Sequence, residues 1–206
     1  MKNHPTPWQT TTQRLAMARY FYDNDPYRHH VVIHNGQQFY DLLGQESKYT
    51  GLSLQTHRTD FGAVYPEINY WHRLARKQKV RWAIAIDEPG DAQHSLIPDA
   101  DVKGEYAKTH DFARQNALWG NLMAGGWGAE WYFGYKHDHS DLSCEDFRSR
   151  DKFWDQCRHQ LDFIAEQRPP LPSMLPQNKL TSSEQDWVLA QEGQAYLILL
   201  KMGSKP

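Results

Sequence analysis

The feature that most constrains the fold is a repeated alternation of short apolar strand patterns with amphipathic helix patterns. Strand patterns occur at residues 30–34, 49–55, 80–86 and 128–134. Helix patterns occur at residues 12–24, 39–43, 66–75, 106–124 and 147–164. Parallel strands need helical crossovers, so this alternation predicts an α/β fold with a parallel sheet. Four strand–helix units are half of a closed (β/α)8 barrel, and we therefore expect a partial TIM barrel.

A proline-rich segment divides the chain. Four prolines lie within residues 169–176. Because proline lacks a backbone N–H, such a segment does not continue a helix or a central strand. Beyond it, the apolar runs 187–190 and 195–200 flank Glu192-Gly193 and predict a β-hairpin. We expect residues 1–167 to form the barrel part, 168–178 a linker, and 179–206 the start of a β-domain.

Charge and composition exclude several classes of protein. The chain has 23 Lys plus Arg against 25 Asp plus Glu, without a basic cluster, so binding to nucleic acid is not expected. No apolar run approaches the roughly 20 residues that span a bilayer, so no membrane span is predicted. Polar residues follow Met1, so no signal peptide is predicted either, and the sequence does not indicate a compartment. His137-Asp138-His139 lacks the spacing of a metal site, and we expect neither a metal nor a cofactor.

In parallel α/β folds the functional residues lie at the carboxyl ends of the strands. The residues at the four predicted strand ends are polar or aromatic. They are His34 and Asn35, Gln55 and His57, Asp87 and Glu88, and Tyr132 and Tyr135. The alternative for a strand-end histidine is a hydrogen bond to neighbouring backbone.

Asp87-Glu88 is the most informative of these pairs. An apolar strand that ends in two carboxylates places ionisable groups at the rim of a buried layer, where desolvation must be compensated. Side chains alternate along a strand, so the two carboxylates are expected on opposite sides, and we take Glu88 to face the barrel axis. The alternative is that one of them caps a turn before Pro89-Gly90.

Aromatic side chains gather around the last predicted strand. They are Trp119, Trp127, Trp131, Tyr132, Phe133 and Tyr135. Aromatic faces stack on the apolar faces of sugar rings, so this group suits a carbohydrate ligand. The alternative is a role in the core, which we favour for Trp119 and Phe133. Asp141 is expected either to accept hydrogen bonds from sugar hydroxyls or to cap the next helix.

Several segments, taken in order, resemble the apiosidase-like glycoside hydrolases. The matching segments are His29–Asn35, Tyr49–Gln55, Ile86–Glu88, Leu118–Gly126, Tyr132–Tyr135 and Asp141-Leu142. The resemblance covers nearly the whole chain. In that family a (β/α)8 barrel is commonly followed by a β-sandwich labelled as collagen-binding, and residues 178–200 are similar to its beginning.

The resemblance implies a retaining glycoside hydrolase in which Glu88 follows barrel strand seven and is the nucleophile. The other strand-end residues and Asp141 would line the sugar site. Strands one to four and the acid/base glutamate would precede Met1, so the resemblance implies the carboxyl half of a barrel followed by the start of a truncated β-sandwich. Loss of acid assistance lowers the rate by about 10² to 10⁴, so this chain alone is expected to be inactive or weakly active. Relatives usually act outside the cytoplasm.

Two other interpretations stay open. The first is a non-catalytic carbohydrate-binding or interaction protein that keeps the ring-stacking aromatics without the chemistry. The second is an open reading frame that starts at an internal Met. Exposed sheet edges at both ends would then predict self-association.

Overall fold

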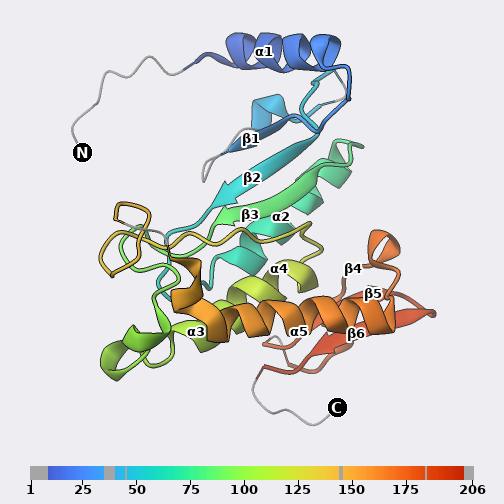
Figure 1. Cartoon of the computed structure of the whole chain (residues 1–206). Coiled ribbons are helices and arrows are strands. Elements are labelled where there is room, and N and C mark those ends of the chain that lie inside the picture. The colour runs from blue at the N-terminus through green and yellow to red at the C-terminus, as the bar shows by residue number, and fades with distance from the viewer. Residues whose placement is uncertain (1–8, 35–39, 45, 144–145, 184, 202–206) are drawn as a thin grey trace.

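The chain folds into a mixed α/β structure. The computed structural model describes residues 9–34, 40–44, 46–143, 146–183 and 185–201. It contains a three-stranded parallel sheet and a small antiparallel sheet (Figure 1). The parallel strands lie in chain order: β1 (Val32–His34), β2 (Gly51–Gln55) and β3 (Ala83–Glu88). The predicted α/β class is confirmed, whereas no closed barrel forms within the described residues.

Four of the five predicted helices are present as α-helices with changed bounds, whereas the brief helix expected at 39–43 is a 3-10 turn at Tyr40–Leu42. The α-helices are α1 (Thr11–Asn24), α2 (Val64–Lys77), α3 (Thr109–Phe112), α4 (Trp119–Met123) and α5 (Asp151–Gln167). A π-helical segment, Ala113–Leu118, joins α3 to α4, so the predicted helix over 106–124 is nearly continuous but not regular. Pro66 lies in the first turn of α2 instead of starting it, which is tolerated because the first N–H groups of a helix have no intrahelical partner.

The main core lies between the parallel sheet and the helices behind it. Leu52 and Leu54 of β2 and Ile84 and Ile86 of β3 are almost fully buried, which is the alternation expected of strands with one covered face. Large side chains of α2 and small ones of the following helical run pack against them. These are Val64, Ile68, Trp71, Ala75, Ala113 and Ala117. The small side chains of Ala113 and Ala117 let the helical run lie close to α2.

The first predicted strand differs from its prediction. Residues 30–34 were expected to form a short buried strand, but β1 covers Val32–His34 and the side chain of Val32 is 47% exposed. The reason is its place in the sheet: β1 lies at the edge beside β2, away from the helices that cover β2 and β3 (Figure 1). An edge strand can leave one face and one backbone side open to solvent.

The fourth predicted strand is reduced to a single parallel bridge between Ile86 and Ala129. Around the bridge, the Ile86 N–H donates to Gly128 O at 3.0 Å and the Glu130 N–H donates to Ile86 O at 2.8 Å. The chain then leaves β3, because Tyr132 O accepts from the Leu96 N–H at 3.1 Å. The loop that follows β3 thus takes the hydrogen bonds that would extend the strand.

The predicted β-hairpin is confirmed and gains a third strand. β5 (Trp187–Gln191) and β6 (Ala195–Leu199) are antiparallel, and β4 (Leu175–Pro176) pairs with β5. The Trp187 ring stacks on Tyr65 of α2, with centroids 4.3 Å apart and planes at 8°. The hairpin therefore packs on the helices of the main core. The division into barrel part, linker and β-domain stays a prediction.

The described helices are too short or too polar to cross a membrane.

Candidate active site

A β-bulge shapes the end of β3, where Asp87 and Glu88 lie. Leu54 of β2 pairs with Ile86, but the next residue of β2, Gln55, pairs with Glu88, so Asp87 is the extra residue. A bulge interrupts the alternation of side chains between the two faces of a sheet and redirects a side chain. The two carboxylates, predicted to point to opposite sides, instead both approach one imidazole.

That imidazole belongs to His34, at the end of β1. Its Nδ1 lies 2.7 Å from Asp87 Oδ2, and its Nε2 lies 3.6 Å from Glu88 Oε2. Ser53 of β2 also donates a hydrogen bond to Asp87 Oδ2. The three strands end at the same edge of a parallel sheet, which is why residues far apart in the sequence meet here. We call Asp87, His34 and Glu88 the carboxylate cluster.

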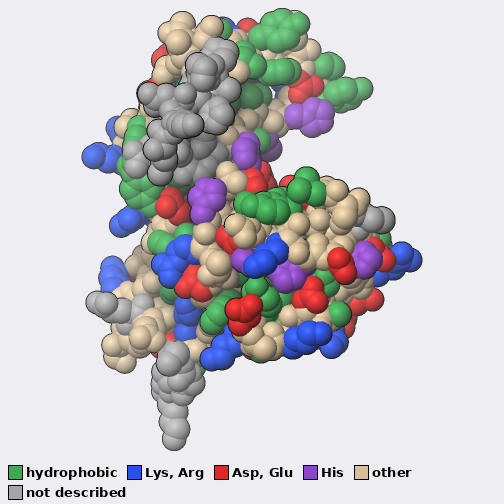
Figure 2. Space-filling model, turned by 90° about the vertical axis from the view of Figure 1, so that its left-hand side faces the viewer, with side chains coloured by type: hydrophobic (Ala, Val, Ile, Leu, Met, Phe, Trp, Pro, Cys, Tyr) green, Lys and Arg blue, Asp and Glu red, His purple; other side chains and the backbone are tan. Residues whose placement is uncertain are grey.

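The carboxylate cluster is open to ligands. The side chains of Asp87 and Glu88 are 22% and 24% exposed, and that of His34 is 53% exposed. Asp87 Oδ1 is buried and accepts no hydrogen bond within the described residues, so it is an unused acceptor. Figure 2 faces this side of the molecule and shows acidic and histidine side chains gathered near the middle of the face, beside a hollow.

Tyr132 lies within electrostatic range of Glu88. Burial raises the pKa of its phenol, and the charges of Asp141 and Glu88 raise it further. Its hydroxyl donates to Ala92 O at 3.4 Å. A phenol whose pKa is raised keeps its proton at neutral pH, so Tyr132 is a hydrogen-bond donor there. Tyr132 thus interacts electrostatically with both Glu88 and Asp141.

The remaining predicted site residues are placed less centrally. Gln55 is the strand partner of Glu88 in the register of β2 and β3. His57 is exposed, and Tyr135 is 47% exposed. Asn35 lies outside the described residues. The structure therefore brings His34, Asp87 and Glu88 together, with Gln55 paired to Glu88 and Tyr132 within electrostatic range of Glu88.

Sequence reasoning missed Thr56, which fixes the backbone beside Glu88. Thr56 is 3% exposed, and its N–H donates to Glu88 O at 3.0 Å. Its hydroxyl accepts a hydrogen bond from the Gly90 N–H at 3.2 Å. A buried threonine directly after a strand was the available signal, but its two partners are set by the fold.

A second polar group, also missed, lies in the loops that follow β3 and Ala129. His94 Nδ1 is 2.9 Å from Asp91 Oδ1, and His137 Nδ1 is 2.8 Å from Asp101 Oδ2. The Lys136 ammonium lies 3.3 Å from His94 Nε2. The three-residue spacing of Asp91 and His94 is a local signal, whereas nothing local indicates the pairing of His137 with Asp101. Among the described residues, no three His, Cys, Asp or Glu side chains are grouped so that they could hold a metal ion.

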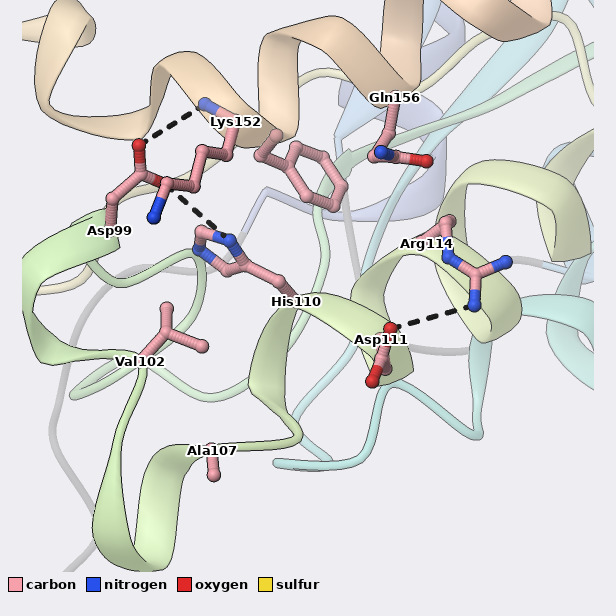
Figure 3. A pocket seen from close by; sticks show the side chains of 9 residues that line it. Asp99, Val102, Ala107, His110, Asp111, Arg114, Lys152 and Gln156 are labelled. Carbon is pink, nitrogen blue, oxygen red and sulfur yellow. Dashed lines mark hydrogen bonds and ion pairs between the residues drawn. The ribbon is translucent and has the colours of Figure 1, made fainter.

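A separate pocket of about 260 Å³ lies between the start of α5 and the helical run that begins with α3 (Figure 3). Its lining residues are Asp99, Val102, Ala107, His110, Asp111, Arg114, Lys152, Phe153 and Gln156. Asp99 accepts a hydrogen bond from the Lys152 N–H at 3.1 Å, and Asp111 pairs with Arg114 at 3.5 Å. Burial lowers the pKa of His110, which keeps this imidazole neutral at pH 7. The acidic groups of the pocket are already engaged, and none of the predicted site residues in the described chain lines it.

Comparisons with models of protein families, with curated proteins and with solved structures find no match to this chain.

Proposed function

We propose that this protein is a glycoside hydrolase-like protein that acts on a poly- or oligosaccharide by a retaining mechanism, with Glu88 as the nucleophile. The observation that supports this most is the position of Glu88 at the carboxyl end of β3, partly exposed and close to His34. A retaining glycosidase needs an ionised carboxylate that attacks the anomeric carbon and forms a covalent glycosyl intermediate. A side chain that is 24% exposed is both accessible to a sugar and held by its surroundings.

We also propose that β1, β2 and β3 are arranged as strands five to seven of a (β/α)8 barrel. Their spatial order follows the chain order and all are parallel, as in a barrel. Residues 127–130 run beside β3, which supports assigning them to the eighth strand. In such a barrel the carboxylate cluster belongs at the catalytic end.

The proposed sugar contacts divide into hydrogen bonds and ring stacking. Asp87 Oδ1 is a buried acceptor without a donor in the described chain, so a sugar hydroxyl would satisfy it. The Tyr132 hydroxyl can donate to a sugar oxygen. Tyr135 is 47% exposed, and its ring offers an apolar face for a pyranose ring.

The test is release of the dye from nitrophenyl and dinitrophenyl glycosides of the common pentoses and hexoses. Glu88→Gln keeps the shape of the side chain but removes the nucleophile, so we expect turnover to fall at least about a thousandfold. The matched control is Glu192→Gln, because Glu192 is exposed in the turn between β5 and β6, away from β1, β2 and β3. Turnover that survives Glu88→Gln would refute the proposal.

The second candidate is a carbohydrate-binding protein without turnover. The exposed rings of Trp127 and Tyr135 favour it, since stacking alone gives binding and needs no carboxylate. In that case glycan binding would persist in Glu88→Gln and fall in Trp127→Ala, and the unaltered chain would hydrolyse none of the glycosides.

A further inference from the structure

Retaining hydrolysis at Glu88 also requires a proton donor for the departing oxygen. In a retaining enzyme this group lies about 5 Å from the nucleophile and alternates between acid and base. The structure brings His34 Nε2 to 3.6 Å from Glu88 Oε2, and the His34 side chain is 53% exposed. A substrate that enters beside Glu88 therefore meets the His34 imidazole.

Asp87 prepares His34 for this role. The Nδ1–H of His34 donates to Asp87 Oδ2 at 2.7 Å, which fixes the ring and leaves Nε2 directed toward the Glu88 side. Ser53 donates to the same carboxylate oxygen and holds Asp87 in place. An aspartate that orients an imidazole and stabilises its protonated form is the arrangement that serves general acid–base catalysis in hydrolytic triads.

The neighbouring groups are less suited to supply the proton. Asp87 is already engaged by His34 and Ser53. The Tyr132 phenol has its pKa raised by burial and by nearby carboxylates, so it holds its proton too firmly to protonate a leaving group at neutral pH. Histidine, by contrast, is the residue type that exchanges a proton most readily in this range.

We propose that His34 is the general acid and base of the reaction at Glu88, with Asp87 as its positioning residue. This inference rests on the proposed function. In the first step the Glu88 carboxylate bonds to the anomeric carbon while the carbon–oxygen bond to the leaving group breaks, and the Nε2 proton of His34 goes to the departing oxygen. In the second step neutral Nε2 takes a proton from water, the water oxygen bonds to the anomeric carbon, and Glu88 leaves as a carboxylate.

The experiment compares leaving groups that need protonation with those that do not. Dinitrophenolate leaves without a proton, whereas phenol and sugar alcohols need one. We expect His34→Gln to lower kcat/KM on phenyl glycosides by about 10² to 10⁴ and to change it by less than about tenfold on dinitrophenyl glycosides. Asp87→Asn should likewise lower kcat/KM on phenyl glycosides more than on dinitrophenyl glycosides, because Asp87 acts through His34. Without a base, the second step should limit kcat of His34→Gln on the dinitrophenyl substrate. Added azide should raise this kcat, because azide attacks the glycosyl intermediate in place of water and needs no base.

The matched control is His29→Gln. His29 also pairs through Nδ1 with an aspartate, Asp25, at 2.8 Å, but its side chain is 74% exposed and belongs to the loop after α1. This variant should keep the natural rate on both substrates.

The outcomes separate the two proposals. If Glu88→Gln abolishes turnover but His34→Gln loses equally on both leaving groups, or loses nothing, the role of His34 is refuted and the glycosidase stands. If the unaltered chain hydrolyses none of the glycosides, the proposed function fails, and the role of His34 fails with it.

Discussion

Arg150 is the buried charge that ties together the loops of the proposed site, and its removal gives a sharp prediction. Its side chain is fully buried. Its guanidinium donates to Leu96 O at 2.8 Å, to His139 O at 2.9 Å and to Ser149 Oγ at 2.6 Å. It also lies 4.0 Å from the centroid of the Phe133 ring. One side chain thus joins the loop after β3 to the loop that leads to Asp141.

The perturbation is Arg150→Met, which keeps most of the apolar stem and removes the charge. Each hydrogen bond from a charged donor contributes about 1.5 to 3 kcal/mol to the free energy of unfolding, and the variant loses these contributions. The variant also no longer has to bury a charged guanidinium, and this gain offsets part of the loss. Burial lowers the pKa of Arg150, which is the sign of that desolvation cost. Because the carbonyl oxygens of Leu96, which is buried, and of His139 lose their donor, we expect the free energy of unfolding to fall by about 3 kcal/mol.

The assay is urea unfolding followed by tryptophan fluorescence, with the slope m compared between variants. The control is Arg158→Met on α5, since Arg158 is 58% exposed and pairs with Asp155 and Asp162 at the surface. Such exposed pairs contribute little, so the midpoint of this variant should stay near that of the natural chain. A loss of less than about 0.5 kcal/mol in Arg150→Met would refute the reasoning.

Three other predictions concern the core and its titratable groups. Burial raises the pKa of the Cys157 thiol to about 11. In a Cys144→Ser background, Cys157 should therefore react with a thiol reagent at pH 8 far more slowly in the folded protein than in urea. Equal rates would contradict this prediction. Burial lowers the pKa of His72, so this histidine stabilises the folded protein above its unfolded pKa of about 6.5, and the stabilisation is lost as the pH falls below that value. His72→Gln should therefore reduce the difference in unfolding free energy between pH 7 and pH 5. An unchanged difference would contradict this prediction. Trp187→Ala removes the ring stacked on Tyr65 and should lower the free energy of unfolding, measured in urea, by about 3 to 5 kcal/mol. A loss below about 1 kcal/mol would show that the hairpin does not depend on this contact.

Local patterns predicted most of the helices and strands. Apolar periodicity places α2, β2, β3 and the β5–β6 hairpin close to their observed bounds, because each has a buried face. α1 also lies close to its predicted bounds, although Ala18 is its only buried residue. It failed for residues 128–134, where the hydrogen bonds that would extend a strand go to the loop after β3. It also failed for β1, since an apolar run does not distinguish an edge strand from a covered one.

The candidate site was predicted in part, for a similar reason. The rule that strand ends meet at one edge identified His34, Asp87 and Glu88 from the sequence. The β-bulge at Asp87 was not predicted, because it arises from the pairing of β2 with β3 and leaves no mark in β3 alone. Arg150 was missed because its partners, Leu96 and His139, are distant along the chain or in irregular loops.

The central claim is that the Glu88 carboxylate forms a covalent bond with a sugar. The most direct measurement is mass spectrometry of the protein after incubation with dinitrophenyl glycosides that carry fluorine beside the anomeric carbon, which slows release of the intermediate. We predict a mass increase of one fluorosugar, located at Glu88 by peptide sequencing and absent from Glu88→Gln. A label on another carboxylate, or no label from a sugar whose unfluorinated glycoside the protein hydrolyses, would contradict the claim.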